Sequence, residues 1–594
     1  MDNADQIQTM RSLSPARKST DATSAGELAD EQLIHFGIAP SSEFGQALLK
    51  VVANLYQTAG HISQLAEITK TTLEALPHTD RVSYFNAKKF LCFQLAKLID
   101  SLQPGLRTSY KHLGFDRRTH LAKGDYPLFA NVGTLFSASP AIVRTATYLY
   151  ACTEWVDDAF HGRESTHPIY SRLLNPTSIA LSNTMVELEA GPYSSEYLAW
   201  NFNSGMAAID AILSNQLKRD DILVVSRNIY GGSHQLLHDY FARENRLNIQ
   251  LEWFDGFSGD QFERFLKTIK QHYKSKLDSG SQLHIYLESP CNPHGNMLDV
   301  PAICDIAHRD NHSVMLDSTL ATPILNKPLQ RENISERPDY VIHSYTKDLA
   351  GSGNTTAGVV IGESHKMFIP KGSTHNNISW EQTLFWDVYY IKGAFLDADK
   401  AAEVLNGIKT LENRMLSKCI NTLIFTRYLD SHPAISVNSH ALESHPNASL
   451  RKKNLYLGLP SPLFSIDFEQ AQLPKEAFVR FFDALAPAFG HMVSLGQNDT
   501  LMLCPALTSH SELSPEALKH AEIHPTTIRV AMGGENPRDL INHFREAARL
   551  HLDTASNDFS SGFMTESALE KLIGSITLTV YKQHLDYQAE KAKN

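Results

Sequence analysis

Short, almost wholly apolar runs recur through the middle of the chain and alternate with amphipathic stretches. Such runs predict strands that are buried on both faces of a sheet. Five of them stand out, at residues 222–226, 283–288, 313–317, 340–344 and 358–362. The stretches at 206–217 and 301–310 repeat apolar residues at helical spacing and predict helices between the strands. This alternation predicts an α/β fold built on a mostly parallel sheet.

The pattern changes before this region. Residues 1–30 are rich in Ser, Thr, Asp and Ala and predict a flexible arm. Residues 31–125 predict a helical extension that serves for packing or oligomer contacts. Two amphipathic faces support it, Leu48/Val52/Leu55 and Leu91/Leu95/Leu98/Leu102. We expect Pro104-Gly105 to end the second helix.

The pattern changes again near residue 406. Residues 407–433 predict one long helix, and 463–467, 491–494 and 527–532 predict strands of a smaller α+β domain. A Ser/Asp/Gly linker at 554–562 precedes a last helix, which we expect to start at Ser567 with Glu570 in a capping box. The predicted domains are therefore 126–405 (large), 406–551 (small) and 552–594 (linker and C-terminal helix).

Composition narrows the class of protein. The 594 residues carry a formal net charge of −11, with 42% hydrophobic and 20% charged residues, as in soluble globular proteins. A mildly acidic chain argues against a nucleic-acid partner, and no apolar run is long enough to span a membrane. The polar N-terminus lacks the apolar core of a secretory signal, and six scattered cysteines without CxxC spacing suit free thiols. We expect a cytoplasmic protein.

The candidate chemistry centres on a lysine. Lys347 follows closely on the strand that ends at Ser344, and Thr346 lies between them. The carboxyl ends of parallel strands are where α/β sheets place their sites. Lysine forms Schiff bases with carbonyl compounds, and neighbouring hydroxyls can bind phosphate oxygens.

Three other loops fit the same chemistry. Asp317 ends a predicted strand, and a pyridoxal cofactor needs a carboxylate at its pyridine nitrogen. Residues 203–206 precede a helix whose first N–H groups form a phosphate cradle. Tyr230, followed by Gly231-Gly232, offers a ring for stacking. The order of these loops predicts a pyridoxal 5'-phosphate site.

These segments carry a family resemblance. The chain resembles the Cys/Met-metabolism (trans-sulfuration) family of pyridoxal-phosphate enzymes, in particular its cystathionine γ-synthase-like members. The matching segments are 170–172, 175–177, 204–209, 230–232, 288–293, 317–323, 344–347, 407–411, 494–496 and 528–530. The resemblance covers roughly 127–551 and implies a fold type I architecture, with a large mostly parallel-sheet domain and a smaller C-terminal α+β domain.

The resemblance also implies catalytic roles. Lys347 would hold the cofactor as a Schiff base and then move protons between the substrate's α- and γ-carbons. Asp317 would keep the pyridine nitrogen protonated. Tyr230 would stack on the ring and assist proton transfer to the leaving group. Asn292 would lie near the phenolic oxygen of the cofactor.

Further residues would bind the phosphate and the substrate. Gly205, Met206, Ser344 and Thr346 would hold the phosphate within one subunit. Arg529, aided by Ser494, would bind the substrate's α-carboxylate. Tyr170 and Arg172 would reach the phosphate of a neighbouring subunit, which implies a homo-oligomer of at least two chains, usually a dimer of dimers.

Some positions depart from the family pattern. Asp348 follows the lysine where an aromatic residue is usual, and a carboxylate turned toward the lysine would favour a protonated imine. Gly232 stands where methionine γ-lyases carry cysteine. Val493 stands where cystathionine-handling members often carry glutamate. γ-Replacement on an activated homoserine by a sulfur nucleophile is the leading interpretation.

Alternatives remain open. A carbon–sulfur γ-lyase, of the cystathionine or methionine type, is close behind, and β-elimination by the same fold is also possible. A non-catalytic scaffold with a retained pyridoxal-binding core is a rival from another class. The carboxylates of 154–158 and the pair His234/His238 are weak metal candidates, so we expect no metal.

Overall fold

The computed structural model describes residues 23–73, 80–112, 114–123, 137–150, 153–161, 169–508, 518, 523–556 and 558–591. The chain divides into two compact units. The first comprises Met1–Ala141 with Tyr148–Ile169, and the second comprises Ile142–Thr147 with Tyr170–Asn594. The predicted domain boundaries at 405/406 and 551/552 both fall inside the second unit and stay predictions.

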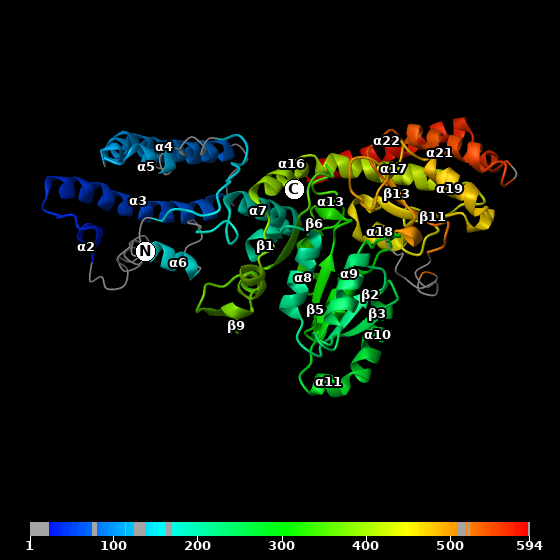
Figure 1. Ribbon diagram of the computed structural model, residues 1–594, viewed down its shortest axis with the longest axis horizontal. Coiled ribbons are helices and arrows are strands. Elements are labelled where there is room, and N and C mark those ends of the chain that lie inside the picture. The colour runs from blue at the N-terminus through cyan, green and yellow to red at the C-terminus, as the bar shows by residue number, and fades with distance from the viewer. Residues whose placement is uncertain are drawn as a thin grey trace. The chain divides into compact units, whose positions relative to one another are not determined.

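The described part of the first unit is mostly helical (Figure 1). Helices α3, α4 and α5 lie in the predicted helical extension, whereas α6 lies in the range assigned to the large domain. Its helices are α2 (Ala25–His35), α3 (Glu43–Leu73), α4 (Asp80–Lys111), α5 (Arg117–Lys123) and α6 (Thr153–Phe160). Ser24 caps α2 by accepting from the N–H of Glu27, so a helix begins inside the range expected to be a flexible arm. Residues 1–22 of that range lie outside the described residues.

The expected end of the second amphipathic helix is wrong. Helix α4 continues through Pro104 and Gly105 to Lys111. Proline lacks an N–H donor, but its φ of about −65° is helical, so a helix can continue past it at a local cost. Two leucines of its predicted face, Leu95 and Leu98, are 37% and 42% exposed.

The second unit is built on a seven-stranded sheet of order β1-β7-β6-β5-β4-β2-β3. Only β7 runs antiparallel to its neighbours, so the sheet is mostly parallel, as predicted. The strands are β1 (Tyr197–Phe202), β2 (Ile222–Ser226), β3 (Gln250–Phe254), β4 (Leu283–Glu288), β5 (Ser313–Asp317), β6 (Tyr340–Ser344) and β7 (Gly358–Glu363). The five apolar runs of the sequence correspond to β2, β4, β5, β6 and β7.

Helices cover both faces of this sheet. Along β2, Leu223 and Val225 pack toward α8, while Ile222 and Val224 pack toward α10 and α12 on the other face. Helices α7 and α16 cover the β1–β7–β6 part of that second face. The helices are α7 (Pro176–Ala190), α8 (Gly205–Gln216), α9 (Gly231–Leu236), α10 (Gly259–His272), α11 (Lys274–Asp278), α12 (Val300–Arg309), α13 (Thr322–Leu325), α14 (Ser364–Met367), α15 (Tyr390–Lys392) and α16 (Ala398–Ile408).

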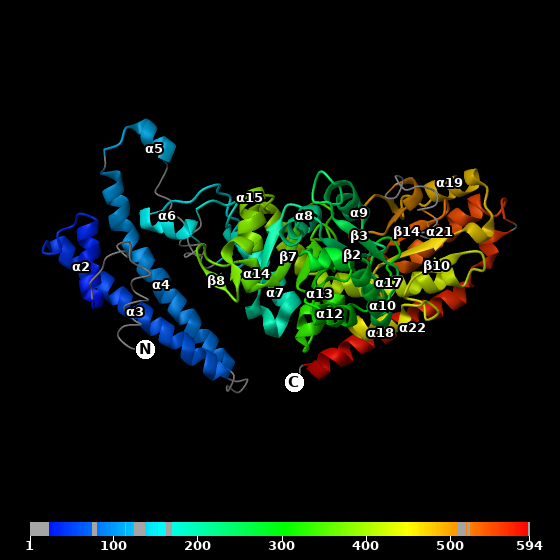
Figure 2. The same ribbon diagram turned by 90° about the horizontal axis from the view of Figure 1, so that it is seen from below.

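A second sheet follows, of order β10-β11-β14-β13-β12. Its strands are β10 (Ser436–Asn438), β11 (Leu463–Asp467), β12 (Gly490–His491), β13 (Leu501–Leu503) and β14 (Ile528–Ala531), and a hairpin of β8 (Thr374–His375) and β9 (Ile378–Ser379) stands apart. Its helices are α17 (Leu411–Asp430), α18 (Ala448–Asn454), α19 (Lys475–Asp483), α21 (Pro537–His551) and α22 (Glu566–Lys591). Helix α22 lies along α17 in both views (Figure 1, Figure 2).

Three details of this region differ from the predictions. The helix expected at 407–433 is two helices, because α16 ends at Ile408 where Gly407 passes so close to Ala350 that no Cβ would fit. The strand expected at 491–494 covers only Gly490–His491. Helix α22 is capped by Thr565 and not Ser567, and Glu570 instead forms an ion pair with Arg538.

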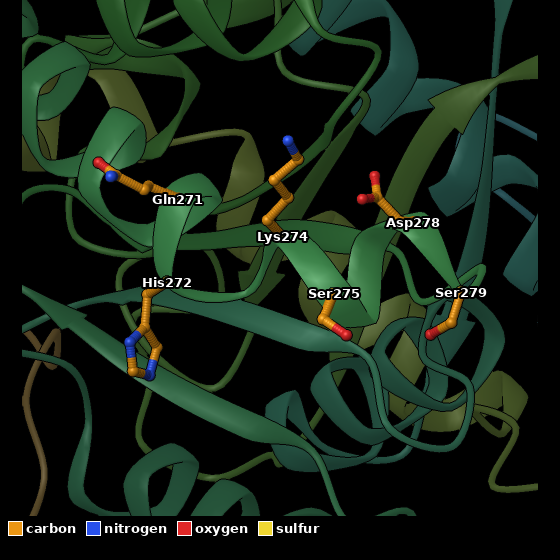
Figure 3. A pocket seen from close by; sticks show the side chains of 6 residues that line it. All are labelled: Gln271, His272, Lys274, Ser275, Asp278 and Ser279. Carbon is orange, nitrogen blue, oxygen red and sulfur yellow. The ribbon is translucent and has the colours of Figure 1, made fainter.

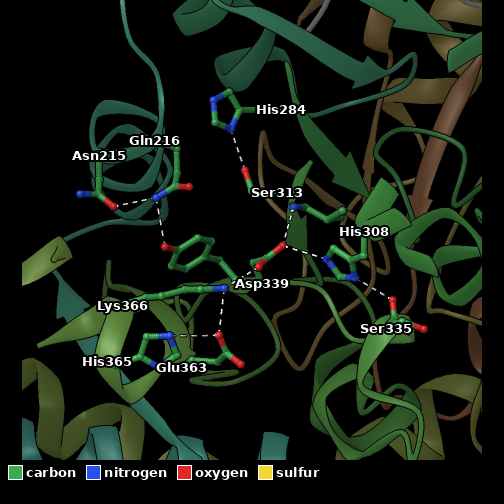
Figure 4. A network of polar contacts seen from close by, with 12 residues as sticks. Asn215, Gln216, His284, His308, Ser313, Ser335, Asp339, Glu363, His365 and Lys366 are labelled. Carbon is green, nitrogen blue, oxygen red and sulfur yellow. Dashed lines mark hydrogen bonds and ion pairs between the residues drawn. The ribbon is translucent and has the colours of Figure 1, made fainter. Parts of the chain in front are cut away.

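A partly buried polar network fixes the amino end of β6 (Figure 4). Asp339 accepts from the N–H of Val314 at 2.8 Å and from Nζ of Lys366 at 2.6 Å, and its other contact is His308 Nε2 at 3.0 Å. His308 Nδ1 lies 2.7 Å from the carbonyl oxygen of Ser335. Burial opposes the charged form of His308, but both of its nitrogens face acceptors, and these contacts raise its pKa.

The helices and the cysteines bear on where the protein can reside. Among the described residues, no helix is both long enough and apolar enough to cross a membrane. Cys92, Cys291, Cys304, Cys419 and Cys504 are free thiols, as expected, and Cys152 lies outside the described residues. The cytoplasmic location stays a prediction.

Candidate active site

A cavity of about 1190 Å³ opens at the carboxyl edge of the large sheet. The parallel strands β1, β2, β4, β5 and β6 all end at this edge, so the loops that follow them meet there. Ten of the predicted site residues line the cavity: Gly205, Met206, Tyr230, Asn292, Asp317, Ser344, Thr346, Lys347, Ser494 and Arg529. Two predicted residues, Tyr170 and Arg172, do not line it.

Lys347 projects into this cavity just beyond β6. Its Nζ donates to Oγ of Ser494 at 3.5 Å. Burial, followed by the charge of Arg529, lowers the pKa of Lys347 below its usual range, which makes a neutral amine easier to reach. The Ser494 loop can approach because Gly496 has φ +81° and a Cβ there would lie 2.8 Å from Cα of Lys347.

Two buried carboxyl groups stand side by side at the cavity floor. Glu288 and Asp317 are partners in the β4–β5 register. Asp317 accepts from Oγ1 and N–H of Thr319, at 2.6 and 3.0 Å. Burial raises the pKa of Asp317, although the Thr319 hydrogen bonds oppose this, whereas burial and the charge of Asp317 together raise the pKa of Glu288 well above its usual range. The Thr319 hydrogen bonds therefore favour the charged form of Asp317 over that of Glu288.

Arg529 on β14 contributes the small sheet's part of the cavity lining. Its Nη1 donates to Oδ1 of Asn292 at 3.2 Å, and its Nη2 donates to the carbonyl oxygen of Ser494 at 2.5 Å. Burial lowers the pKa of Arg529 to about 10. Its Nε is buried without a hydrogen-bond partner, so the guanidinium keeps an unused donor. An anionic ligand would stabilise this charge.

The first turn of α8 forms a cradle for an anion. Ser204 caps the helix by accepting from the N–H of Ala207, which leaves the first N–H groups of the helix available. A Cβ on Gly205 would lie 2.7 Å from Cβ of Ser344, so only glycine lets α8 come this close to β6. Thr346 Oγ1 already bonds the backbone of Ala357, as acceptor from its N–H at 3.1 Å.

Tyr230 forms the side wall. Its side chain is 42% exposed, and its N–H donates to Oε2 of Glu288 at 2.6 Å. The ring rests against the first turn of α9, since a Cβ on Gly232 would lie 2.6 Å from Cε1 of Tyr230. A side chain at position 232 would therefore touch the tyrosine ring directly.

Tyr170 and Arg172 lie at the start of the second unit. Nη1 of Arg172 donates to the carbonyl oxygen of Tyr390 at 2.6 Å, and the guanidinium lies 5.5 Å from the centre of the Tyr170 ring. Tyr170 is 42% exposed. In this chain the two residues form a pair outside the cavity that Lys347 lines.

Glu288 and Thr319 are residues for which the sequence reasoning found no role. Both lie at or just after a strand end in the cavity. The rule that singled out Asp317, a polar residue at the carboxyl end of a parallel strand, applies equally to Glu288. Arg227 and Trp253 also line the cavity and were not predicted, because only the fold brings them there. His234 and His238, which the sequence offered only as weak metal candidates, line it as well.

A second, shallow pocket of about 630 Å³ lies where α10 meets α11. It is lined by Gln271, His272, Lys274, Ser275, Asp278 and Ser279. Figure 3 shows Lys274 and His272 pointing to opposite sides of this helical turn. Side chains that diverge on the surface do not converge on a ligand, so we assign no role to this pocket.

The donor set of the large cavity fits pyridoxal phosphate. A carboxylate in position for the ring nitrogen is present in Asp317, an anion cradle in the start of α8, and a buried amine in Lys347. The unused donor of Arg529 suits a substrate carboxylate. These groups enclose one space, as a cofactor with an amino-acid substrate requires.

Comparison with known proteins gives the same picture. The chain matches the Cys/Met metabolism PLP-dependent enzyme family over residues 131–549. It is 28% identical over 444 residues to an L-methionine gamma-lyase of Pseudomonas deceptionensis, covering 74% of this chain and 98% of that one. It is 27% identical over 422 residues to an O-acetyl-L-homoserine sulfhydrylase of Corynebacterium glutamicum, covering 66% and 90%.

A solved structure is also similar. The crystal structure of a putative O-acetylhomoserine (thiol)-lyase from Campylobacter jejuni aligns with a TM-score of 0.59 and 28% identity, over 69% of this chain and 95% of that one. That protein carries a pyridoxyl-lysine monophosphate. The predicted fold type I architecture and the pyridoxal-phosphate cofactor are confirmed, and the scaffold alternative gives way to an enzyme. The chain belongs to the Cys/Met metabolism family of PLP-dependent enzymes.

Proposed function

We propose that the protein catalyses γ-replacement on an activated homoserine, with a sulfur nucleophile displacing an ester group. The observation that carries the proposal is that Lys347, Asp317 and Arg529 converge on one cavity. This set provides a proton-transfer amine, a ring-nitrogen partner and a carboxylate clamp. The O-acetylhomoserine sulfhydrylases among the relatives support the replacement reaction.

Each residue would do a defined task. When bound, pyridoxal phosphate supplies an electron sink next to the substrate's α-carbon. Asp317 would accept a hydrogen bond from the protonated ring nitrogen. Arg529 would bind the α-carboxylate in a two-pronged contact and fix the α-carbon near Nζ of Lys347. Lys347, whose depressed pKa favours the neutral amine, would remove and return protons at the α- and β-carbons, while the sulfur nucleophile takes the place of the ester at the γ-carbon.

The remaining predicted residues would hold the cofactor. Gly205 and Met206 would offer backbone N–H groups to the phosphate, and Ser344 would offer its hydroxyl. Thr346 would have to redirect the hydroxyl that now bonds Ala357. Tyr230 would stack on the ring and pass a proton to the leaving group, and Asn292 would lie near the phenolic oxygen.

Position 232 favours replacement over methionine γ-elimination. Gly232 leaves no side chain beside the Tyr230 ring, where the resemblance places a cysteine in methionine γ-lyases. Val493, 70% exposed at the cavity, offers no carboxylate to a distal amino group. The methionine γ-lyases among the relatives, 28% identical, support γ-elimination as the second candidate.

Product analysis separates the candidates. The protein, loaded with pyridoxal phosphate, is given O-acetyl- or O-succinyl-L-homoserine with and without sulfide, and separately L-methionine or cystathionine. We expect a thiol-containing amino acid that appears only when ester and sulfide are both present. Keto acid released from methionine without added thiol would favour the lyase instead.

We also propose that Tyr170 and Arg172 complete the site of a neighbouring copy of the chain. Their position outside the cavity of their own chain supports this, as does the exposed ring of Tyr170. The active unit would then be at least a dimer.

A further inference from the structure

Glu288 occupies a special place at the end of β4. Its side chain lines the cavity yet is only 5% exposed, and its own N–H donates to Oγ of Ser226 at the end of β2. The backbone of Glu288 is thus tied to the neighbouring strand β2. None of the catalytic tasks described above uses it.

Both carboxyl oxygens of Glu288 are committed to backbone groups of two different loops. Oε2 accepts from the N–H of Tyr230 at 2.6 Å, and Oε1 accepts from the N–H of Asn292 at 2.8 Å. Tyr230 lies 58 positions from Glu288 in the sequence, so this hydrogen bond ties together two segments that meet only in the folded protein. A carboxyl group buried in this way fixes both loops relative to the sheet.

The hydrogen bonds continue from Asn292 to Arg529 on β14. Asn292 Oδ1 accepts from Nη1 of Arg529 at 3.2 Å, and Arg529 Nη2 donates to the carbonyl oxygen of Ser494 at 2.5 Å. Ser494 Oγ in turn accepts from Nζ of Lys347 at 3.5 Å. One chain of hydrogen bonds therefore runs from the Tyr230 loop around the cavity to the lysine.

We propose that Glu288 is a positioning residue that holds the ring-stacking Tyr230 and, through Asn292, the carboxylate-binding Arg529 in a fixed spacing across the cavity. The inference rests on the proposed roles of Tyr230 and Arg529. Tyr230 follows β2 and Arg529 lies on β14, so the relative placement of the cofactor ring and the substrate carboxylate depends on this link. Misplacement of reacting groups by a small distance lowers reaction rates strongly.

The proposed role of Glu288 is geometric and rests on its two backbone hydrogen bonds. Burial, and then the charge of Asp317, raise the pKa of Glu288 well above its usual range. Glu288→Gln keeps the size of the side chain. The amide oxygen of glutamine still accepts one backbone N–H, but its NH₂ group cannot accept the other.

A matched control exists at the opposite end of the same sheet. Asp221 is 1% exposed and also accepts two backbone N–H groups, from Lys218 and Gln282, each at 2.7 Å. Asp221 does not line the cavity. Asp221→Asn thus removes an equivalent tie between backbone segments, without touching either wall of the site.

The test uses three readouts on the cofactor-loaded proteins: thermal midpoint, visible circular dichroism of the bound cofactor, and the dissociation constant of L-norleucine, an amino acid without a γ-leaving group. We expect Glu288→Gln to alter the dichroism and to weaken norleucine binding about tenfold, as for loss of one buried hydrogen bond. Asp221→Asn should lower the midpoint while leaving both other readouts within about twofold of wild type.

Two results would overturn the proposal. One is a Glu288→Gln protein whose dichroism and norleucine affinity equal those of wild type. The other is an Asp221→Asn protein that changes them as much as Glu288→Gln does, because the effect would then be general destabilisation. If Glu288→Gln fails to fold, Glu288→Asp, too short to reach both N–H groups, is judged by the same criteria. None of the three readouts needs turnover. A wild-type protein that converts no homoserine ester would therefore refute the proposed function and leave this test intact.

Discussion

The carboxylate of Asp348 lies 2.6 Å from Nζ of Lys418, and both side chains are 1% exposed. Lys418 also donates to the carbonyl oxygen of Gln497 at 2.5 Å. The carboxylate that follows Lys347 in the sequence is therefore turned into the interior toward α17. An aspartate at position 348, where the family usually has an aromatic residue, thus contributes an ion pair that holds α17 against the Lys347 loop.

Removing one partner of this ion pair should destabilise the protein. Lys418→Met leaves the Asp348 carboxyl buried without its ion-pair partner, which costs about 3–5 kcal/mol in comparable pairs. Replacing both, as Asp348→Leu with Lys418→Met, should recover most of the loss. Urea unfolding of the cofactor-loaded proteins measures both effects. A Lys418→Met protein as stable as wild type would show that the pair contributes nothing.

The His308–Asp339–Lys366 network should make stability depend on pH (Figure 4). Burial lowers the pKa of His308, but its hydrogen bond and charge interaction with Asp339 outweigh this and raise the pKa above 6.5. A raised histidine pKa gives stability that is fully present below 6.5 and is lost as pH rises through the folded-state value. The loss of stability caused by Asp339→Asn should therefore be larger near about pH 6 than near about pH 9.

The control is the same comparison in a His308→Gln background. There the loss of stability caused by Asp339→Asn should be equal at the two pH values. Urea midpoints at each pH provide the measurement. A difference that is equal at both pH values in the wild-type background would mean that His308 is not charged in the network. At the acidic end, burial opposes but the His308 and Lys366 contacts lower the pKa of Asp339, so its contribution is present above 3.8 and is lost as pH falls further.

Position 232 should affect the choice of reaction. Gly232→Cys places a thiol against the Tyr230 ring, where a Cβ alone would come within 2.6 Å of Cε1. The ring must move, so we expect sulfide-dependent replacement to fall by about tenfold or more. We expect keto-acid formation from L-methionine to fall less or to rise. Gly232→Ala separates steric from thiol effects, and unchanged replacement kinetics in both variants would refute the assignment.

A shared site between subunits predicts complementation. Lys347→Ala and Arg172→Ala chains should each be inactive alone, but a mixed dimer contains one site with both residues intact. Random mixing during co-expression should restore about a quarter of the wild-type activity. Activity that stays at the sum of the two parents would place Arg172 outside the site of any subunit.

The fold could be predicted where burial is complete. Strands β2, β4 and β5 have the predicted bounds because runs such as 222–226 are apolar on both faces. Strand β3 was missed because it is an edge strand in which Gln250 and Glu252 interrupt the apolar pattern. The end of α16 was missed because the close contact between Gly407 and Ala350 is tertiary, and no local signal reports it.

The same division holds for the site. Residues carried by sequence motifs, such as Asp317 and Arg529, line the cavity together. The orientation of Asp348 could not be predicted, because its partner Lys418 lies 70 positions further along the chain. The two ties made by Glu288 depend in the same way on loops that meet only in the folded sheet.

The central claim is that Lys347 holds pyridoxal phosphate in a catalytic cavity. Borohydride reduction of the cofactor-loaded protein, followed by digestion and mass spectrometry, identifies the lysine that carries the cofactor. The account predicts a pyridoxyl group on the peptide containing Lys347 and a visible absorption band that Lys347→Ala abolishes. A pyridoxyl group on a different lysine, or no labelled peptide from wild-type protein saturated with pyridoxal phosphate, would contradict it.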